Sequence, residues 1–216
     1  MNIILFGPPG AGKGTQADNI VKSFNLFKIS TGDLLRKAIR NNTDLGRKIK
    51  SLMEKGSLVP DSIIDNLITK ILSDKKYYNT LIFDGYPRNL DQAKNLDKLL
   101  NNYNQKISCV LNLEVNKDLL LKRILGRLIC TKCGSIFNKY FKPQTNINHL
   151  CGNNSLIKRS DDNEKTLINR YETYLDKTLP ILNYYKKLNL LHEIKGEGEI
   201  DQIFEEIKAI IASLEA

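Results

Sequence analysis

The chain has 216 residues, of which 41% are hydrophobic and 26% charged, and its formal net charge is +9. This length and composition predict a globular protein with a sizeable core, and no apolar run approaches the ~18 residues of a membrane-spanning helix. The N-terminal segment has the pattern of a strand rather than of a signal peptide, and lysines are spread along the chain without a basic tail. We therefore expect a cytoplasmic protein with neither a membrane nor a nucleic-acid partner.

The first motif lies between a predicted strand and a predicted helix. Residues 2–6 form a short apolar run of strand type, and apolar residues recur at helical spacing from 16 to 24. The intervening sequence GPPGAGKGT, 7–15, follows the G-x-x-x-x-G-K pattern of a phosphate-binding loop, with Gly14 where the strict motif has Ser or Thr. Backbone N–H groups at the helix N-terminus and the charge of Lys13 would bind phosphate oxygens there.

Strands and helices alternate along the rest of the chain. Pro180 is expected to interrupt the long helix that begins near residue 164. Such alternation predicts an α/β fold, with helices flanking a five-stranded parallel sheet and right-handed crossovers. The further strands are expected at 27–29, 80–84, 107–113 and 190–194, and the further helices at 34–39, 44–55, 61–71, 91–100, 117–125, from 164 onward and at 200–214.

One segment breaks this periodicity. Residues 126–162 contain three of the four cysteines, together with asparagines, glycines, a proline and several aromatic residues. We interpret the segment as a small inserted subdomain. The fourth cysteine, Cys109, falls within a predicted strand and is interpreted as a small core residue.

Two sets of charged residues are candidates for chemistry. Asp84 ends a predicted buried strand, and ligands of such sheets bind beyond the carboxyl ends of the strands, so Asp84 is expected to face the phosphate loop and to hold Mg²⁺ through water. Arginine matches phosphate oxygens with two parallel hydrogen bonds. The arginine candidates are Arg36, Arg88, Arg123, Arg127, Arg159 and Arg170, of which Arg123 and Arg127 share a helix face.

Five motifs, in this order along the chain, resemble the adenylate kinase family. They are GPPGAGKGTQA at 7–17, STGDLLR at 30–36, DGYPR at 84–88 with Gln92, RILGR at 123–127, and RSDD at 159–162 with Arg170. The match covers nearly the whole chain and is similar to the long-lid bacterial form. It implies a P-loop NTPase fold with two inserts: a core of 1–29, 60–125 and 163–216, a small helical NMP-binding domain of 30–59, and a lid of 126–162.

The resemblance also implies a reaction and its residues. An adenylate kinase reversibly converts ATP and AMP into two ADP with Mg²⁺, and we expect a monomer. The catalytic set would be Lys13, Arg88, Arg123, Arg127, Arg159 and Arg170. ATP would lie against Gly10, Ala11, Gly12, Lys13, Gly14, Thr15, Arg127, Ile136, Phe137 and Gly198. AMP would lie against Thr31, Arg36, Ser57, Leu58, Val59, Gly85, Tyr86, Pro87, Arg88, Gln92, Arg159 and Arg170. Tyr86 stands where the family usually has Phe, a change that we expect to be tolerated.

Phosphoryl transfer agrees with this residue set. The reaction depends on in-line positioning and charge neutralisation, and the AMP phosphate is already largely ionised at neutral pH because its second pKa is about 6. No general base is therefore needed, and neither His149 nor His192 has to be catalytic. A closing lid should exclude water, which is the competing acceptor.

The cysteines of the insert, Cys130, Cys133 and Cys151, resemble a structural zinc knuckle. The long-lid family often has a fourth ligand three residues after the third cysteine, where this chain has Asn154, a poor zinc ligand. His149 or an aspartate near 161 could complete the site. Otherwise the site is vestigial, and the sequence leaves both outcomes open.

Two other functions fit parts of the sequence. A different P-loop kinase would use another nucleoside monophosphate, or a hydroxyl acceptor with Asp33 as its candidate base. A basic zinc-knuckle protein that binds nucleic acid and uses a nucleotide as a switch would show a steep salt dependence of binding. The chain has no aromatic-rich basic run, which disfavours the second of these functions.

Overall fold

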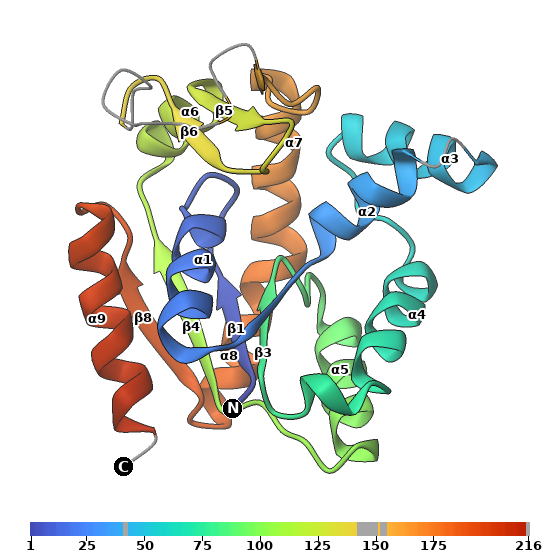
Figure 1. The fold of residues 1–216 in the computed structure, drawn as a ribbon, viewed down its shortest axis with the longest axis vertical. Helices are drawn as coiled ribbons and strands as arrows, with labels where there is room; N and C mark the ends of the chain where they lie inside the picture. Colours follow the sequence, from blue (N-terminus) through green and yellow to red (C-terminus); the bar gives the residue numbers. More distant parts are fainter. Residues whose placement is uncertain (41–42, 142–150, 152–154, 215–216) are drawn as a thin grey trace.

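The computed structural model describes residues 1–40, 43–141, 151 and 155–214. Its centre is a five-stranded parallel sheet in the order β2-β3-β1-β4-β8, covered by helices on both faces (Figure 1). The predicted parallel sheet is therefore confirmed. Its strands are β1 (Ile3–Phe6), β2 (Phe27–Ser30), β3 (Leu81–Asp84), β4 (Cys109–Glu114) and β8 (Leu191–Lys195).

The α-helices of the described residues follow the predicted order. A short 3-10 turn, Lys75–Tyr77, precedes β3. The α-helices are α1 (Lys13–Phe24), α2 (Thr31–Arg40), α3 (Asp44–Glu54), α4 (Asp61–Leu72), α5 (Leu90–Asn102), α6 (Lys117–Leu125), α7 (Glu164–Thr173), α8 (Leu179–Lys187) and α9 (Ile200–Ser213).

The central strand β1 divides the core into two halves. Ile3 and Leu5 pack with residues of α1 and α9, whereas Ile4 and Phe6 pack with residues of α4, α5 and α8. Successive side chains of a strand point to opposite faces, so a strand that is covered on both sides must be apolar at every position. This explains the unbroken apolar run that precedes the phosphate loop, and it anchors the loop on a rigid strand.

Two smaller parts project from the central sheet. Helices α2 and α3 extend to one side (Figure 1), and the Thr43 hydroxyl caps α3 by accepting from the Gly46 N–H at 3.1 Å. The second part is an antiparallel sheet in the order β6-β5-β7, formed by β5 (Arg127–Cys130), β6 (Ile136–Asn138) and β7 (Leu156–Ile157). The segment without clear periodicity thus contains short strands, too short for a sequence pattern to reveal.

The hairpin of β5 and β6 closes at its base. The Lys139 N–H donates to the Gly126 carbonyl at 2.9 Å, and Asn138 Nδ2 donates to the Arg123 carbonyl at 2.7 Å. The end of α6 and the end of β6 are therefore joined where the chain enters this small sheet.

The helix that begins as α7 continues past Pro180 into α8. The expected interruption is therefore wrong in this respect: the helix changes type near Pro180 but does not end there. Residues Tyr174–Thr178 form a π-helical turn, in which the Leu179 N–H donates to the Tyr174 carbonyl, and Pro180 lies in the first turn of α8. Proline lacks an N–H and its ring clashes with the carbonyl four residues earlier. The wider π turn absorbs this conflict without ending the helix.

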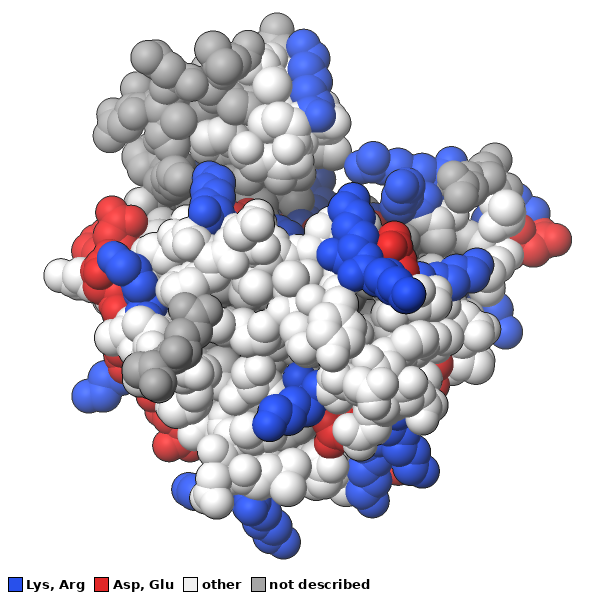
Figure 2. All heavy atoms as spheres, turned by 60° about the horizontal axis from the view of Figure 1, so that its bottom comes forward, with Lys and Arg blue, Asp and Glu red and all other residues white. Residues whose placement is uncertain are grey.

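On the face shown in Figure 2, the basic side chains are not gathered into one patch. In the view of Figure 2, lysine and arginine side chains form separate groups between uncharged and acidic residues. Among the residues that the structure describes, no helix combines the length and apolar character needed to cross a membrane.

Candidate active site

The loop between β1 and α1 is shaped by glycines with positive φ. Gly7, Gly10 and Gly12 have φ angles of 140°, 88° and 96°. A Cβ on Gly7 would lie 2.8 Å from the Leu113 carbonyl oxygen, so the loop also needs glycine to pack against β4. Gly12 is the N-cap of α1 and brings no capping side chain, which leaves the first N–H groups of the helix available to an anion.

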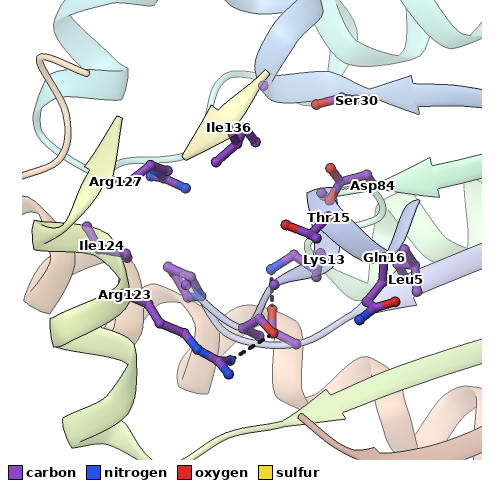
Figure 3. Close-up of a pocket in the computed structure, with 18 of the residues that line it drawn as sticks. Leu5, Lys13, Thr15, Gln16, Ser30, Asp84, Arg123, Ile124, Arg127 and Ile136 are labelled. Atoms are coloured by element: carbon purple, nitrogen blue, oxygen red, sulfur yellow. Dashed lines mark hydrogen bonds between the residues drawn. The ribbon is translucent and has the colours of Figure 1, made fainter. Parts of the chain in front are cut away.

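Lys13 lies at the centre of this loop, close to Asp84 in the view of Figure 3. Its ammonium donates to the carbonyl oxygens of Gly7 and Pro8 at 2.7 and 2.9 Å. Burial, opposed by Asp84 and reinforced by Arg88, lowers the pKa of Lys13 from 10.5 to about 8. Burial also raises the pKa of Asp84, against the charge of Lys13. An anionic ligand would stabilise the charged form of this buried ammonium.

Two buried aspartates hold two of the predicted arginines. Asp161 and Asp162 are 5% and 1% exposed. Arg127 donates to both carboxylate oxygens of Asp162, with an Nε–Oδ2 distance of 2.7 Å, and Arg170 donates to Asp161. Although burial acts to lower it, the pKa of Arg127 is raised by its hydrogen bond to Asp162. These pairs orient guanidinium groups from β5 and α7 toward the same space.

Other arginines are held by Asp33 and by the phosphate loop. Asp33 accepts from Arg36 at 2.6 Å and lies 3.9 Å from Arg159. Burial lowers the pKa of Arg159 to about 10, and the neighbouring arginines add to this shift. Arg123 donates to the Ala11 carbonyl at 3.4 Å and so lies at the outer side of the loop (Figure 3).

The turn after β3 fixes Arg88. Its Nε donates to the Gly85 carbonyl at 2.7 Å, and its backbone N–H donates to Gln92 Oε1 at 2.7 Å. Gln92 is oriented in turn by Asp61, which accepts from its Nε2 at 2.6 Å, and the Thr31 hydroxyl donates to the Gly85 carbonyl at 2.8 Å. Groups from α2, α4 and α5 therefore meet at this turn.

Tyr86 is buried beside this turn, with 1% exposure. Its hydroxyl donates to Asp65 on α4 at 3.2 Å. The tyrosine thus keeps the aromatic packing that phenylalanine would give and satisfies its additional polar group within the protein.

These groups line two adjoining cavities of about 470 and 60 Å³, the larger of which is in the range of ligand pockets. Every residue predicted to bind a nucleotide lines one or both of them, so the structure brings the whole set together. The larger is lined by Gly10, Ala11, Gly12, Lys13, Gly14, Thr15, Asp84, Pro87, Arg123, Arg127, Ile136, Phe137, Arg159 and Gly198. The smaller is lined by Thr31, Ser57, Val59, Tyr86 and Gln92, and both share Arg36, Leu58, Gly85, Arg88 and Arg170.

Several cavity residues were not predicted. Tyr174 and Thr178 come from the π-helical turn, Glu197 precedes Gly198, and Phe141 follows the β6 strand. The only sequence signal near the π turn is Pro180, which indicates a change in the helix but not which side chains turn inward. His192 lies on β8 and is not among the residues that line either cavity.

The cysteines form a separate cluster in the small antiparallel sheet. The sulfur atoms of Cys130, Cys133 and Cys151 lie within 4.8 Å of one another. The backbone N–H groups of Lys132 and Cys133 donate to Cys130 Sγ, at 3.4 and 3.5 Å. His149 and Asn154 lie outside the described residues.

The aspartates near 161 do not join this cluster. Asp161 and Asp162 are paired with Arg170 and Arg127, and among the described residues only the three cysteines bring their ligand atoms together in this cluster. The suggestion that one of them completes a zinc site is therefore wrong.

A glycine-rich loop at the carboxyl end of a central parallel strand, faced by converging arginines, defines a P-loop protein that handles nucleotide phosphates. Comparison with known families agrees, since the profile described as adenylate kinase matches residues 5–190. The chain belongs to the adenylate kinase family.

Relatives that match over nearly their whole length are adenylate kinases. The adenylate kinase of Pelagibacter ubique is 49% identical over 98% of this chain and 99% of that protein. The adenylate kinase of Methanothrix thermoacetophila is 44% identical over 100% of both chains, and that of Clostridioides difficile is 43% identical over 99% of both. The resemblance seen in the five motifs is thus confirmed.

Proposed function

We propose that the chain catalyses the reversible, Mg²⁺-dependent transfer of the terminal phosphoryl group of ATP to AMP, giving two ADP. The observation that carries this proposal is that Arg88 and Arg170 line both cavities. A donor on the phosphate loop and an acceptor in the smaller cavity would bring their phosphates to these two guanidinium groups. Membership of the family supports the same reaction.

On the donor side, the loop N–H groups and Lys13 would hold the phosphates of ATP. The base would extend between Ile136 and Phe137 on β6 and the backbone at Gly198, with Arg123 beside it. All of these groups line the larger cavity. Lys13 would stabilise the charge that shifts toward the bridging oxygen during transfer.

On the acceptor side, Arg36, Arg88 and Arg170 would bind the phosphate of AMP, and Arg127 and Arg159 would close over the transferring group. The AMP base would lie along the smaller cavity, which Thr31, Ser57, Val59 and Gln92 line together with Leu58. Positioning two phosphates in line supplies most of the catalysis expected for this chemistry.

A hydroxyl acceptor is disfavoured by the state of Asp33. Burial acts to raise the pKa of this carboxyl, but Arg36 and its hydrogen bond lower it below the usual value. A carboxylate with a lowered pKa is a weak base for a hydroxyl proton. The ionised AMP phosphate needs no such base.

Magnesium fits beside the phosphate loop. Asp84 lies at the end of β3, and its Oδ2 is 3.7 Å from the position that a Cβ on Gly14 would take. Asp84 would hold Mg²⁺ through water, and the metal would neutralise phosphate charge when bound.

Zinc fits the cysteine cluster, since three thiols converge and two N–H groups support one of them. We propose that Cys130, Cys133 and Cys151 hold a zinc ion that stabilises residues 126–162 as a lid, with His149 the candidate for the fourth ligand. Elemental analysis of chelator-free protein tests this: about one zinc per chain is expected, and well under one means that the site is vestigial. After chelation the melting temperature should fall while transfer keeps its Mg²⁺ requirement.

We further propose that residues 30–59 and 126–162 are covers that close over a fixed core. Asp33 and Arg159, one from each cover, already lie 3.9 Å apart.

We also propose a cytoplasmic location, which suits the free cysteines of the chain. We propose a monomer as well, because the residues that line the larger cavity all come from one chain.

The decisive experiment is a coupled assay for ADP with purified protein, ATP and Mg²⁺. ADP formation is expected with AMP and not with shikimate, and only weakly with CMP, UMP or dTMP. Equal rates with another nucleoside monophosphate would assign a different acceptor. Absence of ADP formation by folded protein with ATP and AMP would refute the proposed reaction.

A further inference from the structure

The π-helical turn between α7 and α8 changes which side chains face the cleft. Arg170 and Thr178 are eight residues apart, which on a continuous α-helix places them about 80° apart around the axis. A π turn takes up one extra residue, worth about 100° of rotation, and leaves roughly 20° between them. Both side chains line the larger cavity, as this rotation requires.

Thr178 uses its position to bind the turn that carries Arg88. The Thr178 side chain is buried, and its hydroxyl donates to the Arg88 carbonyl at 2.8 Å across 90 residues of sequence. The Arg88 N–H and Nε are held by Gln92 and Gly85. Thr178 thus supplies the contact that ties this turn to the helix of Arg170.

This hydrogen bond holds Arg88 in place against the electrostatic repulsion between the Arg88 and Arg170 guanidinium groups. Arg88 and Arg170 are close enough that, after burial, Arg170 is the largest cause lowering the pKa of Arg88, to about 10. Arg170 is paired with Asp161, whereas the hydrogen bonds described for the Arg88 side chain go to a neutral carbonyl. Two repelling guanidinium groups stay together before a phosphate arrives only if the backbone holds them there.

We propose that the π turn, acting through the Thr178 hydroxyl, is the element that positions Arg88 against Arg170 for the acceptor phosphate. Thr178 is a positioning residue, because its contact is with the Arg88 backbone. This inference rests on the proposed role of Arg88 and Arg170 in binding AMP. It adds a residue and a helical irregularity that the motifs do not contain.

The test compares Thr178→Val, which keeps the shape and removes the donor, with Thr178→Ser, which keeps the donor. AMP and ATP dissociation constants are measured by calorimetry, each nucleotide alone, together with melting temperatures. For Thr178→Val we expect AMP binding to weaken on the order of tenfold and ATP binding to change less than twofold. Thr178→Ser should restore AMP affinity to within about threefold. Thr69→Val, on α4 and away from the cavities, is the matched control.

A double-mutant cycle tests in a second way whether Thr178 acts on AMP affinity through Arg88. In an Arg88→Lys background, Thr178→Val should cost much less AMP affinity than in the wild type, because the group that it positions is gone. An undiminished cost, an equal loss for ATP, or unchanged AMP affinity in folded Thr178→Val would each overturn the inference. If the valine variant unfolds, Thr178→Ala undergoes the same comparison. Failure of the wild type itself to bind AMP or form ADP would instead refute the proposed function.

Discussion

The two anion-binding halves of the cleft are built in opposite ways. The phosphate loop uses backbone N–H groups and one lysine, and the hydrogen bonds described for this lysine go to neutral carbonyls of the same loop. The arginine side uses side chains from several elements, and Arg36, Arg127, Arg159 and Arg170 are each in contact with a carboxylate. The loop is therefore ready for phosphate, whereas the arginines must share or exchange their carboxylate partners when phosphate binds.

Because of this difference, substitutions in the phosphate loop and among the arginines should impair nucleotide binding and turnover in different ways. A change in the loop removes an interaction that no other element duplicates. A change among the arginines alters one member of a set whose carboxylate partners can adjust. The following predictions test that contrast, beginning with the largest expected effect.

Lys13→Ala should lower kcat on the order of 10²-fold or more, because the ammonium interacts most strongly with charge that develops during transfer. Steady-state kinetics with ATP and AMP measure this, with exposed Lys22→Ala on the same helix as the control. A kcat within threefold of wild type, with only KM raised, would contradict the role given to Lys13.

Arg88→Lys should weaken AMP use by roughly tenfold and ATP binding much less. Lysine keeps the charge but loses the planar fork and the Nε bond to Gly85. Separate titrations with each nucleotide measure the two affinities. Arg47→Lys, in an exposed pair on α3, is the control. An ATP loss as large as the AMP loss would remove the distinction between the two sides.

Thr166→Val should weaken AMP binding by a few-fold and lower the melting temperature. The buried Thr166 hydroxyl donates to the Glu54 carbonyl at 2.8 Å and so fixes the end of α3, next to the loop that lines the smaller cavity. Leaving that carbonyl unpaired should lower the free energy of unfolding by about 1–3 kcal/mol. Each kcal/mol corresponds to a fall of about 2–4 °C in the melting temperature of a chain of this size. Calorimetry and thermal unfolding check both effects, and Thr166→Ser should recover them. Unchanged AMP affinity would show that the anchor serves stability alone.

Asp33→Asn should have the smallest effect, with ADP formation within about threefold of wild type. The carboxylate is 56% exposed, and ion pairs at such sites contribute little. Losing its negative charge frees Arg36 and Arg159 for phosphate. The same assay with ATP and AMP measures it, and a loss of 10²-fold would indicate that Asp33 acts as a base after all.

The sequence was most informative where the chemistry is local. The phosphate loop could be recognised from residues 7–15 alone, because they lie between a predicted strand and a predicted helix. Asp84 could be recognised because it ends a predicted buried strand. The site residues drawn from the family motifs all line the two cavities, although their roles toward nucleotides stay predictions. Helix α2 begins at Thr31, earlier than the predicted start at 34, because the polar residues 31–33 form its first turn.

Other features were beyond the sequence because they depend on distant contacts. The pairing of Asp161 and Asp162 with arginines is set by how α7 meets β5, and no spacing rule relates those residues. The π turn reflects a compromise between Pro180 and continued packing of α8, which propensity alone predicts as a break. Strands β5, β6 and β7 are shorter than the length at which an alternating pattern can be recognised in a sequence.

The closed base of the β5–β6 hairpin has a consequence for how such enzymes diversify. Because Gly126 and Lys139 meet there, the β5–β6 hairpin leaves and re-enters the rest of the protein at one place. The cysteines of this segment line neither cavity, so we expect that replacing them would leave the phosphate loop unchanged. Stability and any metal dependence would then change with these cysteines, whereas Arg127 and Arg159 of the same segment would have to be kept for the proposed chemistry.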